Sequence, residues 1–148
     1  MEGLKMERNT VSKKPCIWVV DDDENCRDLF SQLLSIEMSV EYPRGFGSAG
    51  EMLTALGRQP APEVILMDFQ MPGINGIEAI PMVHQLAPDT QVVMISSFLN
   101  ETHRRNAMAN GATDFLHKNS PPDRVADAIR HAVSLTTPAN QEKSIDGI

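Results

Sequence analysis

One stretch constrains the fold more than any other: four apolar residues, Val64 to Met67, end abruptly at the carboxylate of Asp68. An apolar run without alternation is typical of a strand buried on both faces of a parallel sheet. Pro72, Gly73 and Asn75-Gly76 follow closely, and these turn-forming residues take the chain out of the sheet. Asp68 is therefore predicted at the carboxyl end of a buried strand, where open α/β sheets place ligands and chemistry.

A strand–helix pattern repeats along the whole chain. Short apolar or β-forming runs predict strands at 16–20, 40–42, 64–67, 91–95 and 113–117, of which 40–42 is the weakest. Apolar residues at helical spacing predict helices at 25–34, 48–56, 75–86, 100–110 and 121–133. In the first of these helices the expected inward residues are Leu29, Phe30, Leu33 and Leu34, while Arg27 is expected to face outward.

Local signals mark the ends of the helices. Asn75 and Glu78 have the spacing of a capping box, and Asn100 is the predicted N-cap of the helix 100–110. Gly111 is expected to end that helix in a left-handed conformation, and Pro81 to kink the helix 75–86. The helix 100–110 has little apolar content, so we expect it to be loosely held.

Strand–helix repeats with short connections imply a parallel sheet covered on both faces and wound with right-handed crossovers. We therefore predict an α/β doubly wound sheet with strand order 2-1-3-4-5. This order makes the first and third strands neighbours, so Asp21 and Asp22 after the first strand should face Asp68.

The 148 residues fit one domain, predicted at 15–135 between a flexible leader, 1–14, and a flexible tail, 136–148. A net charge of −7 argues against direct binding of nucleic acid or anionic membranes by this domain. No apolar run approaches the roughly 18 residues that a membrane span needs. Cys16 and Cys26 lack metal or redox spacing, which favours a reducing cytoplasm.

Polar residues follow the apolar runs at one predicted edge of the sheet: Asp21 and Asp22, Asp68, Ser96 and Lys118. Carboxylates about 4 Å apart repel by roughly 4 kcal/mol per pair at an effective dielectric near 20, and one lysine cannot offset this repulsion. A hard cation with oxygen ligands, Mg²⁺ above all, fits such a group and retains waters that a phosphate can replace.

With this cation, Asp68 can act as a nucleophile that accepts a phosphoryl group. The Ser96 hydroxyl and the Lys118 ammonium can then bind the phosphoryl oxygens. Each residue also has an ordinary interpretation: an aspartate in a turn, acidic residues at a solvated helix start, a surface lysine. Their coincidence at matching strand ends favours the functional interpretation.

These residues are the basis of a family resemblance. Over residues 15–135 the sequence resembles the receiver domain of two-component response regulators. The motifs that carry the resemblance are Val19-Val20-Asp21-Asp22, Met67 to Gly73, Asn75-Gly76, Ser96, Gly111-Ala112 and Lys118. The resemblance implies a flavodoxin-like (βα)₅ fold and a protein of phosphorelay signalling.

The resemblance also implies roles for the acidic residues. Asp68 would take a phosphoryl group from a sensor histidine kinase or phosphotransfer protein. Asp22, Asp68 and the backbone carbonyl of Gln70 would bind Mg²⁺ or Mn²⁺, with Asp21 reaching the metal through water.

A second group of residues is implied to convert phosphorylation into a signal. Ser96, with Ser97 beside it, would be the switch hydroxyl, and Lys118 would contact the phosphoryl group. Phe115 occupies the position of the aromatic ring that turns inward when Ser96 moves. Output, including possible self-association, would use the face formed by residues 98–135.

Some positions depart from the family pattern. Asn119-Ser120 separates Lys118 from Pro121-Pro122, whereas the family usually has proline directly after the lysine. This variant resembles receivers that precede a helix-turn-helix output domain, so the chain either acts alone or is part of a longer regulator. Gln70 and Phe98 are expected to set the lifetime of the phosphoryl group, because bulky Phe98 should hinder attack by water.

Two other functions remain open. A magnesium-dependent phosphohydrolase of the haloacid dehalogenase kind also phosphorylates an aspartate, and Asp21 to Asp23 supply its Asp-x-Asp spacing. Such an enzyme also needs a cap domain and a late acidic motif, which this sequence lacks. The other alternative is a binding module with the same fold that is never phosphorylated, against which the intact acidic residues argue.

Overall fold

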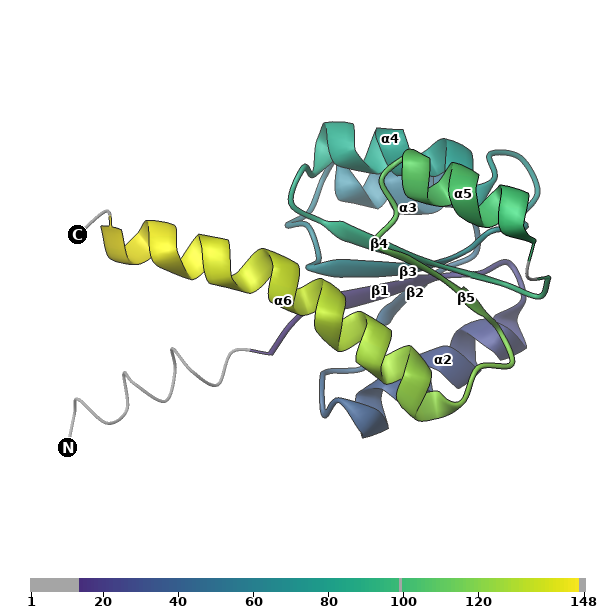
Figure 1. Ribbon diagram of the computed structural model, residues 1–148, viewed down its shortest axis with the longest axis horizontal. Coiled ribbons are helices and arrows are strands. Elements are labelled where there is room, and N and C mark those ends of the chain that lie inside the picture. The colour runs from purple at the N-terminus through teal and green to yellow at the C-terminus, as the bar shows by residue number, and fades with distance from the viewer. Residues whose placement is uncertain (1–13, 99, 147–148) are drawn as a thin grey trace.

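The computed structural model describes residues 14–98 and 100–146. Five strands alternate with the helices along the chain (Figure 1). The strands are β1 (Ile17–Val20), β2 (Arg44–Phe46), β3 (Val64–Asp68), β4 (Gln91–Ser96) and β5 (Asp114–His117). The helices are α2 (Glu24–Glu37), α3 (Ala49–Leu56), α4 (Gly76–Leu86), α5 (Glu101–Ala109) and α6 (Pro122–Asp146).

The strands form one parallel sheet in the order β2-β1-β3-β4-β5, which confirms the predicted doubly wound topology. β1 and β3 are direct neighbours, with Val20 opposite Met67. The residues that follow Val20 and Met67 are Asp21 and Asp68, so the register brings both aspartates to one edge of the sheet. This edge is called the carboxyl edge below.

Helices cover both faces of the sheet, and each face has its own apolar core. α3, α4 and α5 lie over one face, and α2 and α6 lie over the other (Figure 1). Trp18, Ile65 and Met94 point into the first core, and Val19, Leu66 and Val93 point into the second. Because successive strand residues supply opposite cores, the uninterrupted apolar runs at 17–20, 64–67 and 92–95 are buried on both faces of the sheet.

The prediction for the second strand was wrong. The strand is Arg44–Phe46 rather than 40–42, and it pairs with β1 from Trp18 to Val20. The buried Phe46 ring lies 4.9 Å from the Trp18 ring, centroid to centroid, and the Arg44 guanidinium lies over both rings. Packing on β1 therefore determines which residues of this segment form the strand. This contact cannot be predicted from the local sequence.

The prediction for α2 was partly wrong. Phe30 and Leu34 are buried as expected, but Leu29 is 60% exposed. Ser31 is buried in its place. Arg27, expected to face solvent, is half-buried and reaches back to the end of β1.

The helix ends match the local signals. Asn75 accepts a hydrogen bond from the Glu78 amide, and the Glu78 side chain accepts one from the Asn75 amide, so the capping box is present. Asn100 caps α5 by accepting from the His103 amide, and Gly111 after that helix has a φ of 109°. Pro81 lies inside α4 as predicted.

α6 is longer than the sequence pattern indicated. The apolar residues from Val125 to Val133 pack on the sheet, and the backbone stays helical to Asp146, beyond the body of the domain (Figure 1). The predicted tail, 136–148, thus begins inside a helix, and the predicted leader lies almost wholly outside the described residues. Within the described residues, no helix is both long enough and apolar enough to cross a membrane.

Candidate functional site

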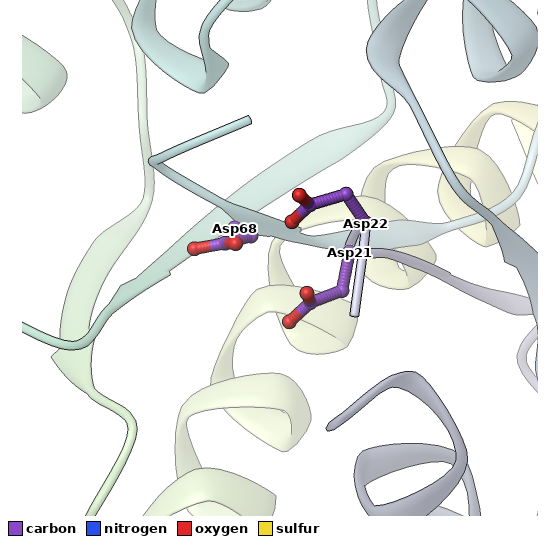
Figure 2. Close-up of side chains that lie close together, drawn as sticks. All are labelled: Asp21, Asp22 and Asp68. Atoms are coloured by element: carbon purple, nitrogen blue, oxygen red, sulfur yellow. The ribbon is translucent and has the colours of Figure 1, made fainter. Parts of the chain in front are cut away.

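Three carboxylates meet at the carboxyl edge. Asp21 and Asp22 follow β1, and Asp68 is the last residue of β3. One carboxylate oxygen from each lies within 4.8 Å of the others. Figure 2 shows the three side chains around a common space. Asp21 and Asp68 are buried, at 2% and 4% exposure, whereas Asp22 is exposed.

Lys118 joins this group from the loop after β5. Its ammonium lies 2.8 Å from Oδ2 of Asp21 and 3.4 Å from Oδ2 of Asp68, and its side chain is 15% exposed. The single cation therefore bridges both buried carboxylates. The predicted meeting of Asp21, Asp22, Asp68 and Lys118 is present in the structure.

The charges at the carboxyl edge are unbalanced. Burial and then the nearby Asp21 charge raise the pKa of Asp68 to about 6, although Lys118 and the Gln70 amide act in the opposite direction. Burial also disfavours the charged form of Lys118, but the hydrogen bond to Asp21 and the charges of both aspartates outweigh it and raise the pKa of the ammonium. The site thus retains the excess negative charge that a cation would neutralise.

Backbone amides fix the two buried carboxylates. Oδ1 of Asp21 accepts a hydrogen bond of 2.9 Å from the Asp23 amide, and Oδ1 of Asp68 accepts one of 3.3 Å from the Gln70 amide. Asp23 in turn caps α2 by accepting from the amides of Asn25 and Cys26. Both loops therefore orient their carboxylates toward the same space.

Ser96 lies on the adjacent strand and is fully buried. Its Oγ accepts a hydrogen bond of 3.1 Å from the Phe98 amide, and its carbonyl accepts one of 2.8 Å from the Lys118 amide. Ser97 is exposed, and the Phe98 side chain is 65% exposed. The hydroxyl of Ser96 is therefore engaged by its own loop rather than by the carboxylates.

A row of rings connects the end of β3 to α5 and β5. Phe69, directly after Asp68, lies 4.5 Å from the His103 ring of α5 and 6.3 Å from the Phe115 ring of β5, centroid to centroid. Phe115 is buried, and Nδ1 of His103 is buried without a hydrogen-bond partner among the described residues. Local sequence patterns indicate no role at this site for His103 or Arg27, and they include Phe69 only as part of the motif Met67 to Gly73.

The donor set suits a hard divalent cation. Three carboxylates from two adjacent strands surround one space, and the cation Lys118 offsets only part of their charge. Oxygen donors with one or two direct carboxylates are typical of Mg²⁺ sites. Among the described residues this is the group whose acidic, cysteine or histidine side chains are close enough to hold a metal.

The profile of the response regulator receiver domain matches residues 17–130, and the chain belongs to this family. The transcriptional regulatory protein YxjL of Bacillus subtilis is 32% identical over 114 residues, which are 77% of this chain and 52% of that protein. The transcriptional regulatory protein DegU of Brevibacillus brevis is 30% identical over 125 residues, 84% of this chain and 52% of DegU. The chain thus spans about half the length of these curated relatives.

Solved structures agree with this assignment. The receiver domain of the putative response regulator NarL from Mycobacterium tuberculosis is 25% identical, with a TM-score of 0.73 over 82% of this chain and 98% of that one. The receiver domain of NtrX from Brucella abortus is 30% identical, with a TM-score of 0.72 over 80% of this chain and 98% of that one. The family is a signalling family rather than one of enzymes.

Proposed function

We propose that the chain is the phosphorylated switch of a two-component system, with Asp68 as the phosphoacceptor. The observation that carries this proposal is the Asp68 carboxylate, which is buried at the end of β3 beside Asp21 and Asp22. It contacts the Lys118 ammonium, which also pairs with Asp21. Such an arrangement serves a reaction in which charge increases at one carboxylate.

The reaction is a phosphoryl transfer. A carboxylate oxygen of Asp68 forms a bond to phosphorus while the phosphorus–nitrogen bond of a phosphohistidine breaks, and the departing imidazole nitrogen takes a proton. The donor is a sensor histidine kinase or a phosphotransfer protein. Lys118 already contacts Asp68 and would bind a phosphoryl oxygen once the group is attached.

Asp22, Asp68 and the Gln70 carbonyl would hold Mg²⁺ or Mn²⁺, with Asp21 acting through a bound water. The cation would neutralise the phosphoryl oxygens and the carboxylates together. Asp21 is suited to the indirect role because both of its oxygens are already engaged, one by the Asp23 amide and the other by Lys118.

Phosphorylation would be read at the adjacent strands. An aspartyl phosphate adds roughly −1.5 to −2 charges, a strong acceptor for the Ser96 hydroxyl. Ser96 now accepts from the Phe98 amide, and its hydroxyl hydrogen would be donated to the phosphoryl group as the side chain moves toward it. Phe115 would follow this movement, and Ser97 and Phe98 lie in the segment that rearranges. Gln70 and Phe98 would control the access of water to the phosphoryl group.

The signal would leave through the face formed by residues 98–135, which contains α5, β5 and the first part of α6. This face would bind a partner, an output domain or a second copy of the chain, in the cytoplasm and without itself binding nucleic acid. Beryllofluoride, which stands in for the phosphoryl group, should change hydrogen exchange at residues 98–118. Unchanged exchange with beryllofluoride bound would contradict this output face.

The test of the acceptor is intact mass spectrometry after incubation with acetyl phosphate and Mg²⁺. The wild-type chain should gain the mass of one phosphoryl group, and Asp68→Asn should gain none. A wild-type mass that never changes would favour the unphosphorylated binding module. Rapid release of phosphate from a generic phosphate ester would favour the phosphohydrolase instead.

A further inference from the structure

Arg27 reaches the end of β1 from α2. Its Nη1 donates a hydrogen bond of 2.7 Å to the backbone carbonyl of Asp21, and the residue is half-buried. Asp21 is also held through its amide, which donates to the Phe46 carbonyl over 3.0 Å. Both backbone groups of this acidic residue are therefore fixed, one by β2 and the other by an arginine side chain.

The carbonyl of Asp21 lies just beyond the paired part of β1, whose register with β2 and β3 ends at Val20. A buried carbonyl that loses its strand partner needs another donor. Arg27 supplies this donor with a charged group, which makes a stronger hydrogen bond than a neutral one. Without it, the turn that carries Asp21 and Asp22 would have to exchange this bond for water and reorient.

The structure keeps space for the Arg27 side chain at Gly45 of β2. A Cβ atom at Gly45 would lie 2.9 Å from Cδ of Arg27 and 3.2 Å from its Cγ. At Gly47 a Cβ atom would lie 3.7 Å from Nη1, which is an ordinary contact. The stem of Arg27 therefore crosses β2 where a side chain is absent, and Gly45 and Arg27 form a matched pair.

We propose that Arg27 is a positioning residue for the cation site: through the Asp21 carbonyl it fixes the turn that presents Asp21 and Asp22. This inference rests on the proposed function, because it assigns the purpose of the contact to metal binding. Arg27 touches neither Asp68 nor Lys118 in the described contacts, so its loss should affect metal affinity more than the phosphoryl chemistry.

The experiment measures Mn²⁺ binding to the full chain by electron paramagnetic resonance, alongside phosphorylation by acetyl phosphate over a range of Mg²⁺ concentrations. Arg27→Met should weaken Mn²⁺ binding about tenfold or more, the usual effect of losing a group that orients a metal ligand. The Mg²⁺ concentration for half-maximal phosphorylation should rise equally, while the rate at saturating Mg²⁺ stays within about twofold. Arg27→Lys, which can still donate to the carbonyl, should recover most of the affinity.

Two further variants separate positioning from general destabilisation. Arg44→Met removes a cation from β2, the strand that also carries Gly45. Arg44 packs on Trp18 and Phe46, so this variant should leave Mn²⁺ affinity unchanged. Gly45→Ala should weaken Mn²⁺ binding by displacing the Arg27 stem, and it should have little further effect when combined with Arg27→Met. If Arg27→Met folds poorly, Gly45→Ala and Arg27→Lys test the inference without it.

The outcomes are distinct. Wild-type affinity in both Arg27→Met and Gly45→Ala would overturn the inference and leave the proposed function intact. Equal weakening by Arg27→Met and Arg44→Met would overturn it as well, since the effect would then be general. A wild-type chain that binds no Mn²⁺ and takes up no phosphoryl group would overturn the proposed function, and this inference with it.

Discussion

The two halves of the carboxyl edge are built differently. The half at β1 and β3 is called the charged half. There Asp21 and Asp68 form ion pairs with the Lys118 ammonium, and each carboxylate also accepts a hydrogen bond from a backbone amide. In the half at β4 and α5, called the aromatic half, Ser96 accepts one hydrogen bond from its own loop, and Phe69 meets His103 through ring contacts.

α5, the helix of the aromatic half, also buries little apolar surface. A shallow groove of about 560 Å³ lies where the loop after β3 meets α5, and it is lined by Phe69, Gln70, Met71, Pro72, Asn75 and His103. Ala107 is the buried residue of α5, so this helix contributes little to the core, as its thin apolar content indicated. Elements with few buried apolar contacts open at low free-energy cost.

The difference suggests a division of work within one edge. The charged half holds its groups in place before the reaction, which favours transfer to one defined oxygen. The aromatic half can change its arrangement afterwards, because a coupling of about 1–3 kcal/mol is enough to shift a partner's affinity 5–150-fold.

Lys118→Met should have the largest effect on stability. It leaves two buried carboxylates without their cation, and breaking a buried pair in this way costs about 3 kcal/mol. Urea unfolding at pH 8 should show this loss, and at pH 4 the loss should be smaller because protonation removes the stranded charge. The exposed Lys14→Met is the control. An equal loss at both pH values would show that the lysine stem, and not its charge, holds the charged half together.

Asp68→Asn should stabilise the fold at neutral pH. The pKa of Asp68 is raised to about 6, so the folded state binds the proton more tightly than the unfolded state does. Protonation of Asp68 therefore stabilises the folded state at low pH, and this contribution to the free energy of unfolding is lost as the pH rises through about 6. Without Mg²⁺, Asp68→Asn should gain about 2 kcal/mol at pH 7.5 and nothing at pH 3.5. Asp89→Asn, at an exposed site, is the comparison, and a gain that does not change with pH would contradict the prediction.

Phe98→Glu should shorten the life of the phosphoryl group. Phe98 is 65% exposed and lies two residues after Ser96, and its apolar ring would exclude water from the acceptor. An acidic residue there would instead orient water, and we expect the decay of the phosphorylated chain to accelerate about tenfold, or ~1.4 kcal/mol in the barrier. Intact mass measured over time gives the rate. Phe98→Leu should decay like the wild type, and unchanged decay in Phe98→Glu would rule out this role.

The contact between Phe69 and His103 should give the smallest effect. A double-mutant cycle with Phe69→Leu and His103→Leu should show a coupling of about 1 kcal/mol in the free energy of unfolding, as close ring pairs do. Beryllofluoride should change this coupling if the ring row moves with the switch. A coupling that is the same with and without beryllofluoride would place Phe69 and His103 outside the signal path.

Local sequence patterns were sufficient to predict the fold class and most residues of the candidate site. Apolar runs that end in Asp21, Asp68 and Ser96 specify buried strands and their ends, and turn residues specify where the chain leaves the sheet. Once the strands are parallel, their carboxyl ends share one edge, so the side chains after them meet for topological reasons. The caps at Asn75 and Asn100 were equally predictable, because capping depends on neighbouring residues alone.

Other features depend on contacts between distant segments and became visible in the folded chain. Residues 44–46 form the second strand because their backbone pairs with β1 and Phe46 packs on Trp18. Arg27 turns inward because the Asp21 carbonyl needs a donor and Gly45 leaves space for its stem, whereas helical spacing alone indicates a solvated arginine. These contacts join residues that are not connected by helical or strand periodicity. They follow from packing and from the need to satisfy buried hydrogen-bonding groups in the folded chain.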